Sequence, residues 1–213
     1  MAYYPVFLEM KGRACLVVGG GQVAARKVDA LLAAGARVTV VSPALDAELA
    51  RLKAGRKVEH VDREYERGDL RRHALVVAAT DDPATNSRVA ADAKASGVLV
   101  NVVDEPALCD FILPSVVRRG EVVLAISTGG LSPALARWLR GELESFLSED
   151  FARLADLLAD VRRDLRERGV SVEPDAWQRA IDGRLRELLA AGRRKEARSR
   201  LLATLEAGPE LPA

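Results

Sequence analysis

A glycine-rich loop contains the residues of this sequence whose spacing points most directly to chemistry. The loop reads GGGQVA at residues 19–24 and fits the pattern G-x-G-x-x-G/A, which holds a pyrophosphate in dinucleotide-binding proteins. In that pattern the first glycine allows a tight turn, the second lets the backbone approach the pyrophosphate, and the small last residue lets helix and strand pack closely. These positions are Gly19, Gly21 and Ala24, so we expect a dinucleotide site here.

Two acidic loops each follow a short apolar run and can lie near the same site. Because the carboxyl ends of parallel strands line the binding crevice of an α/β sheet, Thr80 and Asp81 are candidate cofactor contacts. Asp104 is a candidate general base beside a nicotinamide. Structural roles remain open for both loops, since Asp82 can cap the next helix and a solitary loop carboxylate such as Asp104 is often a turn residue.

A third loop, STGGLSP at residues 127–133, combines hydroxyl side chains, two glycines and a helix start. This composition offers backbone donors to an anion, although a well-capped connection between a strand and a helix has the same composition. Nearby arginines, including Arg118 and Arg137, can pair with carboxylates of a polyanionic ligand. The 32 basic and 31 acidic side chains nearly cancel, so no global field favours nucleic acid or a membrane surface.

Several other chemistries lack the residues that they need. His60 and His73 are the only histidines, and neither lies at ligand spacing from cysteines or carboxylates, so we expect no metal site. No tyrosine is followed four residues later by a lysine, as in many short-chain reductases. Cys15 and Cys109 lie far apart in apolar settings, which favours buried thiols. No apolar run approaches about 18 residues and no leader pattern is present, so we expect a cytoplasmic protein without membrane contact.

The elements that must position these loops alternate between strands and helices. Apolar runs predict strands over residues 14–18, 38–41, 58–61, 75–79 and 98–102. Helices are predicted between them, over residues 23–34, 43–53 and 83–96. Three pairs, Ser42-Pro43, Asp82-Pro83 and Ser132-Pro133, each place a capping side chain before a proline suited to the first helical position. This alternation predicts an α/β fold with a Rossmann-like, doubly wound parallel sheet.

The second half of the sequence has a different composition. A strand is predicted over residues 122–126 and a helix over 133–147. From Asp150 onward, apolar residues at helical spacing predict amphipathic helices, with a break at 173–175 followed by helices over 177–189 and 195–205. We therefore expect three parts: a nucleotide-binding domain at 1–113, a small α+β segment at 114–149, and a C-terminal helical domain at 150–213.

Six motifs, in unbroken order between residues 3 and 147, together resemble one family. The motifs are PVF at 5–7, VVGGGQVAARK at 17–27, AATDD at 78–82, NVVDEP at 101–106, FILPS at 111–115 and STGGLSP at 127–133. The chain resembles precorrin-2 dehydrogenase, the N-terminal module of siroheme synthase. This resemblance implies NAD-dependent oxidation of precorrin-2 to sirohydrochlorin in siroheme biosynthesis, and in some members also insertion of iron into the product.

The resemblance also implies roles for individual residues. The essential aspartate of the family falls on Asp104, and its cofactor contacts fall on Gln22, Val23, Pro43 and Ala44, and near Thr80 and Asp81. The eight carboxylates of the tetrapyrrole need cations and backbone donors, for which the candidates are Ser127, Thr128, Gly129, Arg118 and Arg137. An acidic residue usually holds the adenosine ribose just past the second strand, but Ser42-Pro43 stands there, so the fingerprint does not decide between NAD and NADP.

The resemblance further implies a homodimer whose interface includes the segment at 114–149, and ferrous or cobalt ion as a substrate for chelation. The C-terminal helices carry no motif that we can match to the family. Two other functions remain open from the sequence. One is an NAD-sensing regulatory module without catalysis, in which Asp104 is a turn residue, and the other is a chelatase without dehydrogenase activity.

Overall fold

The computed structural model describes residues 3–206, and the chain divides between Leu113 and Pro114 into two compact units. The first unit contains a five-stranded sheet with its helices, and the second contains a two-stranded sheet followed by a group of helices. Across residues 3–206 there is no helix with the length and apolar character that crossing a membrane requires.

The sheet of the first unit is entirely parallel, with its strands in the order β3-β2-β1-β4-β5. Val18 at the end of β1 pairs with Val41 of β2 on one side and with Ala78 of β4 on the other, so these strands end level with one another. The predicted Rossmann-like fold is confirmed. The strands are β1 (Ala14–Val18), β2 (Arg37–Val41), β3 (Val58–Val61), β4 (Leu75–Ala78) and β5 (Leu99–Val102).

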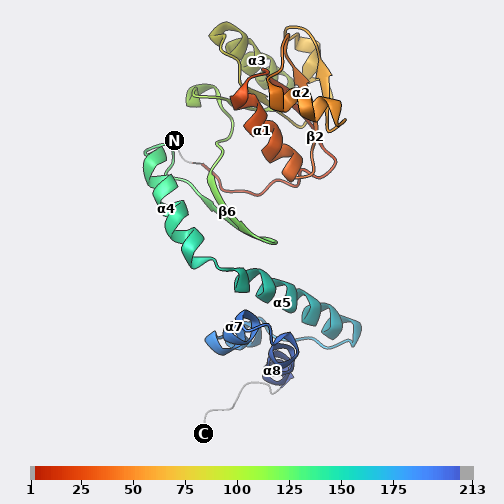
Figure 1. The fold of residues 1–213 in the computed structure, drawn as a ribbon, viewed down its shortest axis with the longest axis vertical. Helices are drawn as coiled ribbons and strands as arrows, with labels where there is room; N and C mark the ends of the chain where they lie inside the picture. Colours follow the sequence, from red (N-terminus) through yellow and green to blue (C-terminus); the bar gives the residue numbers. More distant parts are fainter. Residues whose placement is uncertain (1–2, 207–213) are drawn as a thin grey trace. The chain divides into compact units, whose positions relative to one another are not determined.

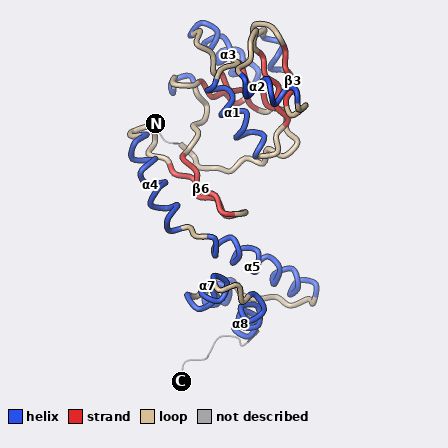
Figure 2. The backbone as a smooth tube through the Cα atoms, in the orientation of Figure 1, coloured by secondary structure: helices blue, strands red, loops and turns tan. Residues whose placement is uncertain are grey.

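Helices cover both faces of this sheet (Figures 1 and 2). Helices α1 (Gln22–Ala33) and α2 (Ala47–Ala54) pack on one face, where Cys15 and Val17 of β1 point. Helix α3 (Pro83–Ser96) packs on the opposite face, where Leu16 and Val18 point. All four side chains are buried, which explains why β1 is continuously apolar rather than alternating. Burial raises the pKa of the Cys15 thiol to about 11, as fits the predicted buried thiol.

The predicted helix start at Ser42-Pro43 is wrong. Helix α2 begins at Ala47, where the Asp46 side chain accepts a hydrogen bond from the Leu49 N–H at 2.9 Å. The Ser42 hydroxyl instead donates to the Ala44 carbonyl at 2.7 Å, which turns the chain before a helix can start. Residues 42–45 therefore form a loop at the end of β2. The two other predicted starts are confirmed, since Asp82 caps α3 and Ser132 caps the helix that begins at Pro133.

The second unit begins with an antiparallel hairpin of β6 (Ser115–Arg119) and β7 (Val122–Ile126). Its turn contains Gly120 with a φ of +56°, a conformation that glycine adopts without strain. The sequence pattern indicated β7 but not β6, because β6 ends in two arginines whereas β7 is apolar throughout. Helix α4 (Pro133–Phe146) packs against the hairpin.

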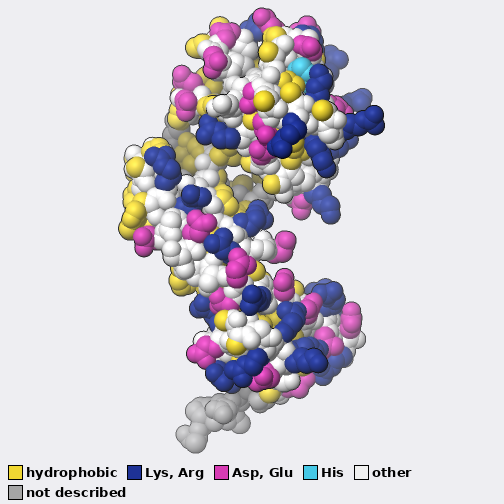
Figure 3. All heavy atoms as spheres, in the orientation of Figure 1, with side chains coloured by type: hydrophobic (Ala, Val, Ile, Leu, Met, Phe, Trp, Pro, Cys, Tyr) yellow, Lys and Arg dark blue, Asp and Glu magenta, His cyan; other side chains and the backbone are white. Residues whose placement is uncertain are grey.

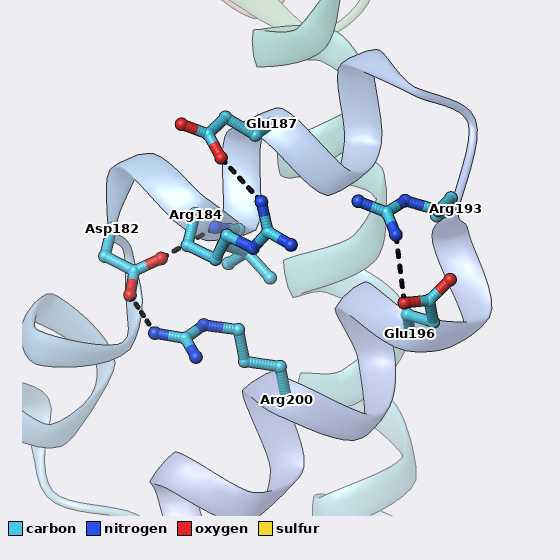
Figure 4. Close-up of polar contacts among 7 residues, drawn as sticks. Asp182, Arg184, Glu187, Arg193, Glu196 and Arg200 are labelled. Atoms are coloured by element: carbon cyan, nitrogen blue, oxygen red, sulfur yellow. Dashed lines mark hydrogen bonds and ion pairs between the residues drawn. The ribbon is translucent and has the colours of Figure 1, made fainter.

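The rest of the second unit is helical, with α5 (Glu149–Glu167), α6 (Pro174–Ala180), α7 (Gly183–Ala190) and α8 (Arg194–Glu206). The predicted single helix over 177–189 is wrong, because the chain is extended at Ile181 and α7 starts anew. There the Asp182 side chain accepts a hydrogen bond from the Leu185 N–H at 2.7 Å and pairs with Arg200 of α8 (Figure 4). The break thus has a cap and a tertiary contact that the periodicity did not show.

Leu157 of α5 tests which interactions stabilise this helical group. The side chain has 0% exposure within an apolar cluster shared by the four helices. We expect Leu157→Ala to lower the free energy of unfolding by about 2–5 kcal/mol, because burial is lost and a cavity remains. Urea denaturation followed by circular dichroism measures this change. The control is Leu131→Ala, at a side chain that is 91% exposed, and equal stability losses in both variants would contradict the assignment.

Candidate functional site

A cavity of about 670 Å³ lies in the first unit, at the edge of the sheet where the parallel strands end. This size is typical of pockets for small ligands and cofactors. Loops that follow all five strands contribute to its walls. Of the residues predicted to form the dinucleotide site, Ala24 alone does not line the cavity, and its side chain is fully buried. The predicted residues that do line it are Gly19, Gly21, Gln22, Val23, Pro43, Ala44, Thr80, Asp81 and Asp104.

Two glycines of the turn after β1 are required because a neighbouring backbone carbonyl lies close to each of them. Gly19 has a φ of +120°, and a Cβ there would overlap the Ala79 carbonyl at the end of β4. A Cβ on Gly20 would overlap the Ala44 carbonyl and lie 2.6 Å from the Ser42 hydroxyl oxygen. Gly20 occupies an unspecified position of the fingerprint, so its requirement became visible only in the structure.

The third glycine differs, because a Cβ on Gly21 would meet no atom within 4 Å. Gly21 is the N-cap of α1 and has no side chain that could bond the free N–H groups of the first helical turn. That turn, which the structure describes in full, contains no acidic residue. Free N–H groups and the positive end of a helix dipole form an anion site. The cradle fits a pyrophosphate and leaves open the space that a side chain would fill.

The loop after β4 is held by a side chain that sequence reasoning missed. Asn86 is buried in α3, and its amide nitrogen donates to the Thr80 carbonyl at 2.9 Å. The Thr80 hydroxyl donates to the Asn86 side-chain oxygen at 2.8 Å. Asp82 caps α3, and hydrogen bonds from the Thr85 hydroxyl and from backbone N–H groups lower the pKa of the Asp82 carboxyl. Asp81 is exposed at the cavity wall between these fixed residues.

Asp104 follows β5, the edge strand of the sheet, and lines the cavity. In the strand order, β5 and β2 lie on opposite sides of β1. Its φ is +62°, in the left-handed region, which Asp and Asn tolerate better than most residues. Left-handed residues other than glycine often mark functional sites. The preceding residue, Val103, donates its N–H to the Ala78 carbonyl at 2.9 Å, which fixes this loop to the end of β4.

The segment after Asp104 folds back on β5 and holds the loop in place. The buried Asn101 amide donates to the Phe111 carbonyl at 2.9 Å. The Val102 N–H lies 3.1 Å from the Cys109 sulfur. Cys109 is partly buried and the second thiol predicted to pack in this way. These contacts join the motif NVVDEP at residues 101–106 to the motif FILPS at 111–115, which explains why the two motifs lie close together in the sequence.

Lys27 of α1 is a further residue that sequence reasoning missed. Its side chain is half-buried, and burial is the main cause that lowers its pKa, with a further contribution from Arg26. The carboxylate of Asp104 acts in the opposite direction and favours the protonated ammonium. Lys27 therefore places a positive charge near Asp104 while lying outside the cavity wall.

The cavity lining is acidic. Among its described residues there are carboxylates but neither lysine nor arginine, and the acidic residues are Asp46, Glu64, Asp81, Asp82 and Asp104. Glu64 comes from the loop after β3, which no nucleotide fingerprint covers. Its neighbours are fixed: Arg63 makes two hydrogen bonds to Asp69, at 2.9 and 2.6 Å, and Tyr65 is buried. A carboxylate is thus presented to the nucleotide cavity from the loop that follows β3, the strand next to β2.

The predicted substrate residues all belong to the second unit. Ser127, Thr128 and Gly129 form the loop between β7 and α4, and Arg137 follows on α4. The Ser127 hydroxyl oxygen accepts a hydrogen bond from the Gly129 N–H at 3.0 Å. The Thr128 hydroxyl bonds to both the N–H and the carbonyl of Ser132, at 3.1 Å each. Arg118 lies on β6, which packs against α4.

The two histidines have different surroundings. His60 lies between the Lys53 ammonium and the Ser42 carbonyl, at 2.9 Å from each. The buried Nδ1 of His73 has no hydrogen-bond partner among the described residues. Within residues 3–206, no three side chains of His, Cys, Asp or Glu are grouped as a metal site would need.

The sheet order, the glycine turn at the level strand ends and the open helix terminus define a dinucleotide-binding protein of the Rossmann type. A family model described as "Putative NAD(P)-binding" matches residues 6–115, and one described as "Sirohaem biosynthesis protein central" matches residues 119–145. The chain belongs to the precorrin-2 dehydrogenase family, which includes the N-terminal part of siroheme synthases. The family predicted from six motifs and a nicotinamide dinucleotide as cofactor are thereby confirmed.

Individual relatives support this family. The siroheme synthase of Thioalkalivibrio sulfidiphilus is 47% identical over 210 residues, which are 98% of this chain and 43% of that protein. The siroheme synthase of Nitrosococcus oceani is 42% identical and matches 98% of this chain and 45% of that protein. The chain therefore spans less than half the length of these curated relatives. A solved structure named SirC, precorrin-2 dehydrogenase, is similar with a TM-score of 0.74 at 28% identity, covering 94% of this chain and 99% of that chain.

Two neighbouring glycines give a test of the turn. Gly21→Ala leaves the fold intact, because its Cβ meets no atom, but we expect NAD affinity to fall about tenfold or more because the methyl group occupies the pyrophosphate space. Gly20→Ala should instead lower the free energy of unfolding by about 1–3 kcal/mol, since the Ala44 carbonyl must move. Isothermal titration and urea denaturation separate the two effects. A stable Gly21→Ala variant with normal NAD affinity would contradict this geometry.

Proposed function

We propose that this chain oxidises precorrin-2 to sirohydrochlorin with NAD, in siroheme biosynthesis. The observation that carries the proposal is that the Asp104 carboxylate lines the same cavity as the open N-terminus of α1. A dehydrogenation needs a hydride acceptor and a base close together. The similarity to SirC, precorrin-2 dehydrogenase, supports the substrate.

The proposed reaction removes one hydride and one proton from precorrin-2 and leaves one additional carbon–carbon double bond. When bound in this cavity, NAD would supply the hydride acceptor. The free N–H groups after Gly21 bind the pyrophosphate, and the loop at Pro43 and Ala44 contacts the adenosine. Thr80 and Asp81 contact the nicotinamide half. The carboxylate of Asp104 takes the proton and passes it to water, so the products are sirohydrochlorin, NADH and a proton.

The proposal assigns the substrate carboxylates to the second unit. The backbone donors of Ser127, Thr128 and Gly129 and the cations Arg118 and Arg137 supply the complementary groups. Insertion of ferrous or cobalt ion into the product would use the metal as a substrate, with Asp104 accepting the two pyrrole protons one after the other and passing each to water. We place the reaction in the cytoplasm, as expected from the sequence.

A homodimer is part of the same proposal, with the segment at 114–149 as the dimerisation segment and 150–213 as a separate helical domain. Hydrophobic side chains gather on the exposed side of α4 (Figure 3). Leu131 is 91% exposed, and Trp138 and Phe146 are each 61% exposed. Large apolar side chains clustered on a surface are typical of a protein interface.

Asp104→Asn tests the catalytic role, because asparagine keeps the left-handed backbone and removes the base. We expect the rate of NADH formation from precorrin-2 to fall about 10²- to 10⁴-fold, with nearly unchanged NAD affinity. Glu105→Gln is the control, a neutralised neighbour that is exposed and lies outside the cavity lining. An unchanged rate in Asp104→Asn would remove Asp104 from the mechanism. Wild-type protein that binds NAD but never forms NADH would favour the regulatory module, and metal insertion without NADH would favour a chelatase.

The acidic lining supports NAD rather than NADP, because a 2′-phosphate would meet Glu64, and the described lining residues include no lysine or arginine to pair with it. We expect wild-type protein to prefer NAD, and Glu64→Lys to raise NADP affinity about tenfold by replacing repulsion with attraction. Asp62→Lys is the matched control, since Asp62 is exposed two residues earlier and lies outside the cavity lining. Fluorescence titration with both dinucleotides measures the effect. The assignment fails if both lysine variants change NADP affinity equally.

A further inference from the structure

The second unit contains an open groove of about 1180 Å³ that the proposed reaction does not use. Its walls are the C-terminal half of α5, the loop that follows, and α6. The apolar lining includes Leu158, Leu165, Val172 and Trp177. The groove shares no residue with the nucleotide cavity, since all of its lining residues lie between 158 and 181.

Three arginines line this groove, and no acidic residue is among the described residues of its lining. Arg163 pairs with Asp160 at 2.7 Å. Within residues 3–206, Arg162 and Arg166 have no carboxylate within 4.0 Å. The two lie four residues apart on α5 and therefore on the same side of the helix. The groove thus combines an apolar floor with two positive charges that the described residues leave unneutralised.

Most other arginines of the same helical group are neutralised by a carboxylate, whereas Arg179 of α6 has none within 4.0 Å among the described residues. Arg184 pairs with Glu187 at 2.9 Å, Arg193 pairs with Glu196 at 3.4 Å, and Arg200 pairs with Asp182 (Figure 4). Across this part of the surface, basic and acidic side chains are mixed (Figure 3). Two unpaired arginines on one side of α5, beside an apolar groove, favour a ligand that is both apolar and anionic.

The groove is held open by the way α5 ends. Gly169 has a φ of +69°, and the Val170 N–H donates to the Leu165 carbonyl at 2.8 Å. This turn directs the chain away from the helix axis until Pro174 begins α6. Trp177 is half-buried and packs on the apolar cluster of the helical group, so its ring is fixed while part of it remains accessible. A preformed site of this kind loses little entropy when a ligand binds.

We propose that this groove binds a polycarboxylate tetrapyrrole, as a site separate from the one where oxidation occurs. The flat macrocycle covers Trp177 and the apolar wall, and peripheral carboxylates pair with Arg162 and Arg166. This inference rests on the proposed function, which supplies the class of ligand. A second copy of this chain fits less well, because the surface of its helices carries both signs of charge, whereas the groove offers only positive charge to its occupant. The site would retain the macrocycle beside the enzyme after oxidation.

The test measures binding of sirohydrochlorin to the full chain. In a Trp138→Phe background, Trp177 is the remaining tryptophan, and the part of its quenching that depends on Arg162 and Arg166 reports occupancy of the groove. We expect the double variant Arg162→Ala/Arg166→Ala to bind sirohydrochlorin with about tenfold lower affinity, as measured by this quenching, because two charge-assisted contacts are lost. Both arginines are exposed, so the fold should persist, and circular dichroism checks this. Arg184→Ala/Arg193→Ala removes the same charge from the same unit outside the groove and should leave the affinity unchanged.

Equal affinities in the two double variants would overturn the groove assignment. Oxidation of precorrin-2 by the Trp138→Phe protein without any quenching of Trp177 would overturn this inference and leave the proposed function intact. Quenching that depends on Arg162 and Arg166, in a protein that forms no NADH, would support the groove and reject the dehydrogenase. Sedimentation that shows the groove variants losing self-association instead of ligand would also overturn the proposal, since a second copy would then occupy the groove.

Discussion

Backbone crowding at the ends of three parallel strands determines the arrangement of the nucleotide cavity. Gly19 lies against the Ala79 carbonyl and Gly20 against the Ala44 carbonyl, with no room for a side chain at either position. These contacts fix the turn after β1 between the loops after β2 and β4. They also direct the first turn of α1, with its free N–H groups, at the cavity. The anion site is therefore a consequence of packing that is completed before any ligand binds.

The two units are stabilised by apolar packing, arranged differently in each. In the first unit, β1 is buried on both faces, so Leu16 and Val17 belong to separate clusters under different helices. In the second, Leu157 and Leu201 lie at the centre of the helical cluster with 0% exposure. Two ion pairs connect α5 with α8, Arg194 with Asp160 and Arg198 with Asp164, the latter at 2.9 Å, but exposed pairs contribute little to stability. These ion pairs favour one relative orientation of α5 and α8, whereas the buried leucines supply most of the stability.

The nucleotide cavity and the groove of the helical group differ in charge. The nucleotide cavity is lined by carboxylates, and its anion site consists of backbone N–H groups rather than cations. Such a site accepts a pyrophosphate, while Glu64 and its neighbours disfavour an additional phosphate on the ribose. The groove of the helical group has the opposite character, with Arg162 and Arg166 beside Trp177. A dinucleotide and a polycarboxylate macrocycle would each meet the surface that suits its charge.

The sequence by itself determined the features that depend on local pattern. Continuous apolar runs predicted the parallel strands, and the spacing of Gly19, Gly21 and Ala24 predicted the turn, because buried strands and phosphate turns restrict residue types locally. Only the tertiary structure decided features that depend on contacts distant in sequence. Ser42 turned the chain through a bond to Ala44 instead of capping a helix, Asp182 broke a periodic helix by pairing with Arg200, and Gly20 was required by a carbonyl 24 residues away. Glu64 reached the cavity because β3 pairs with β2, and no local pattern contains that pairing.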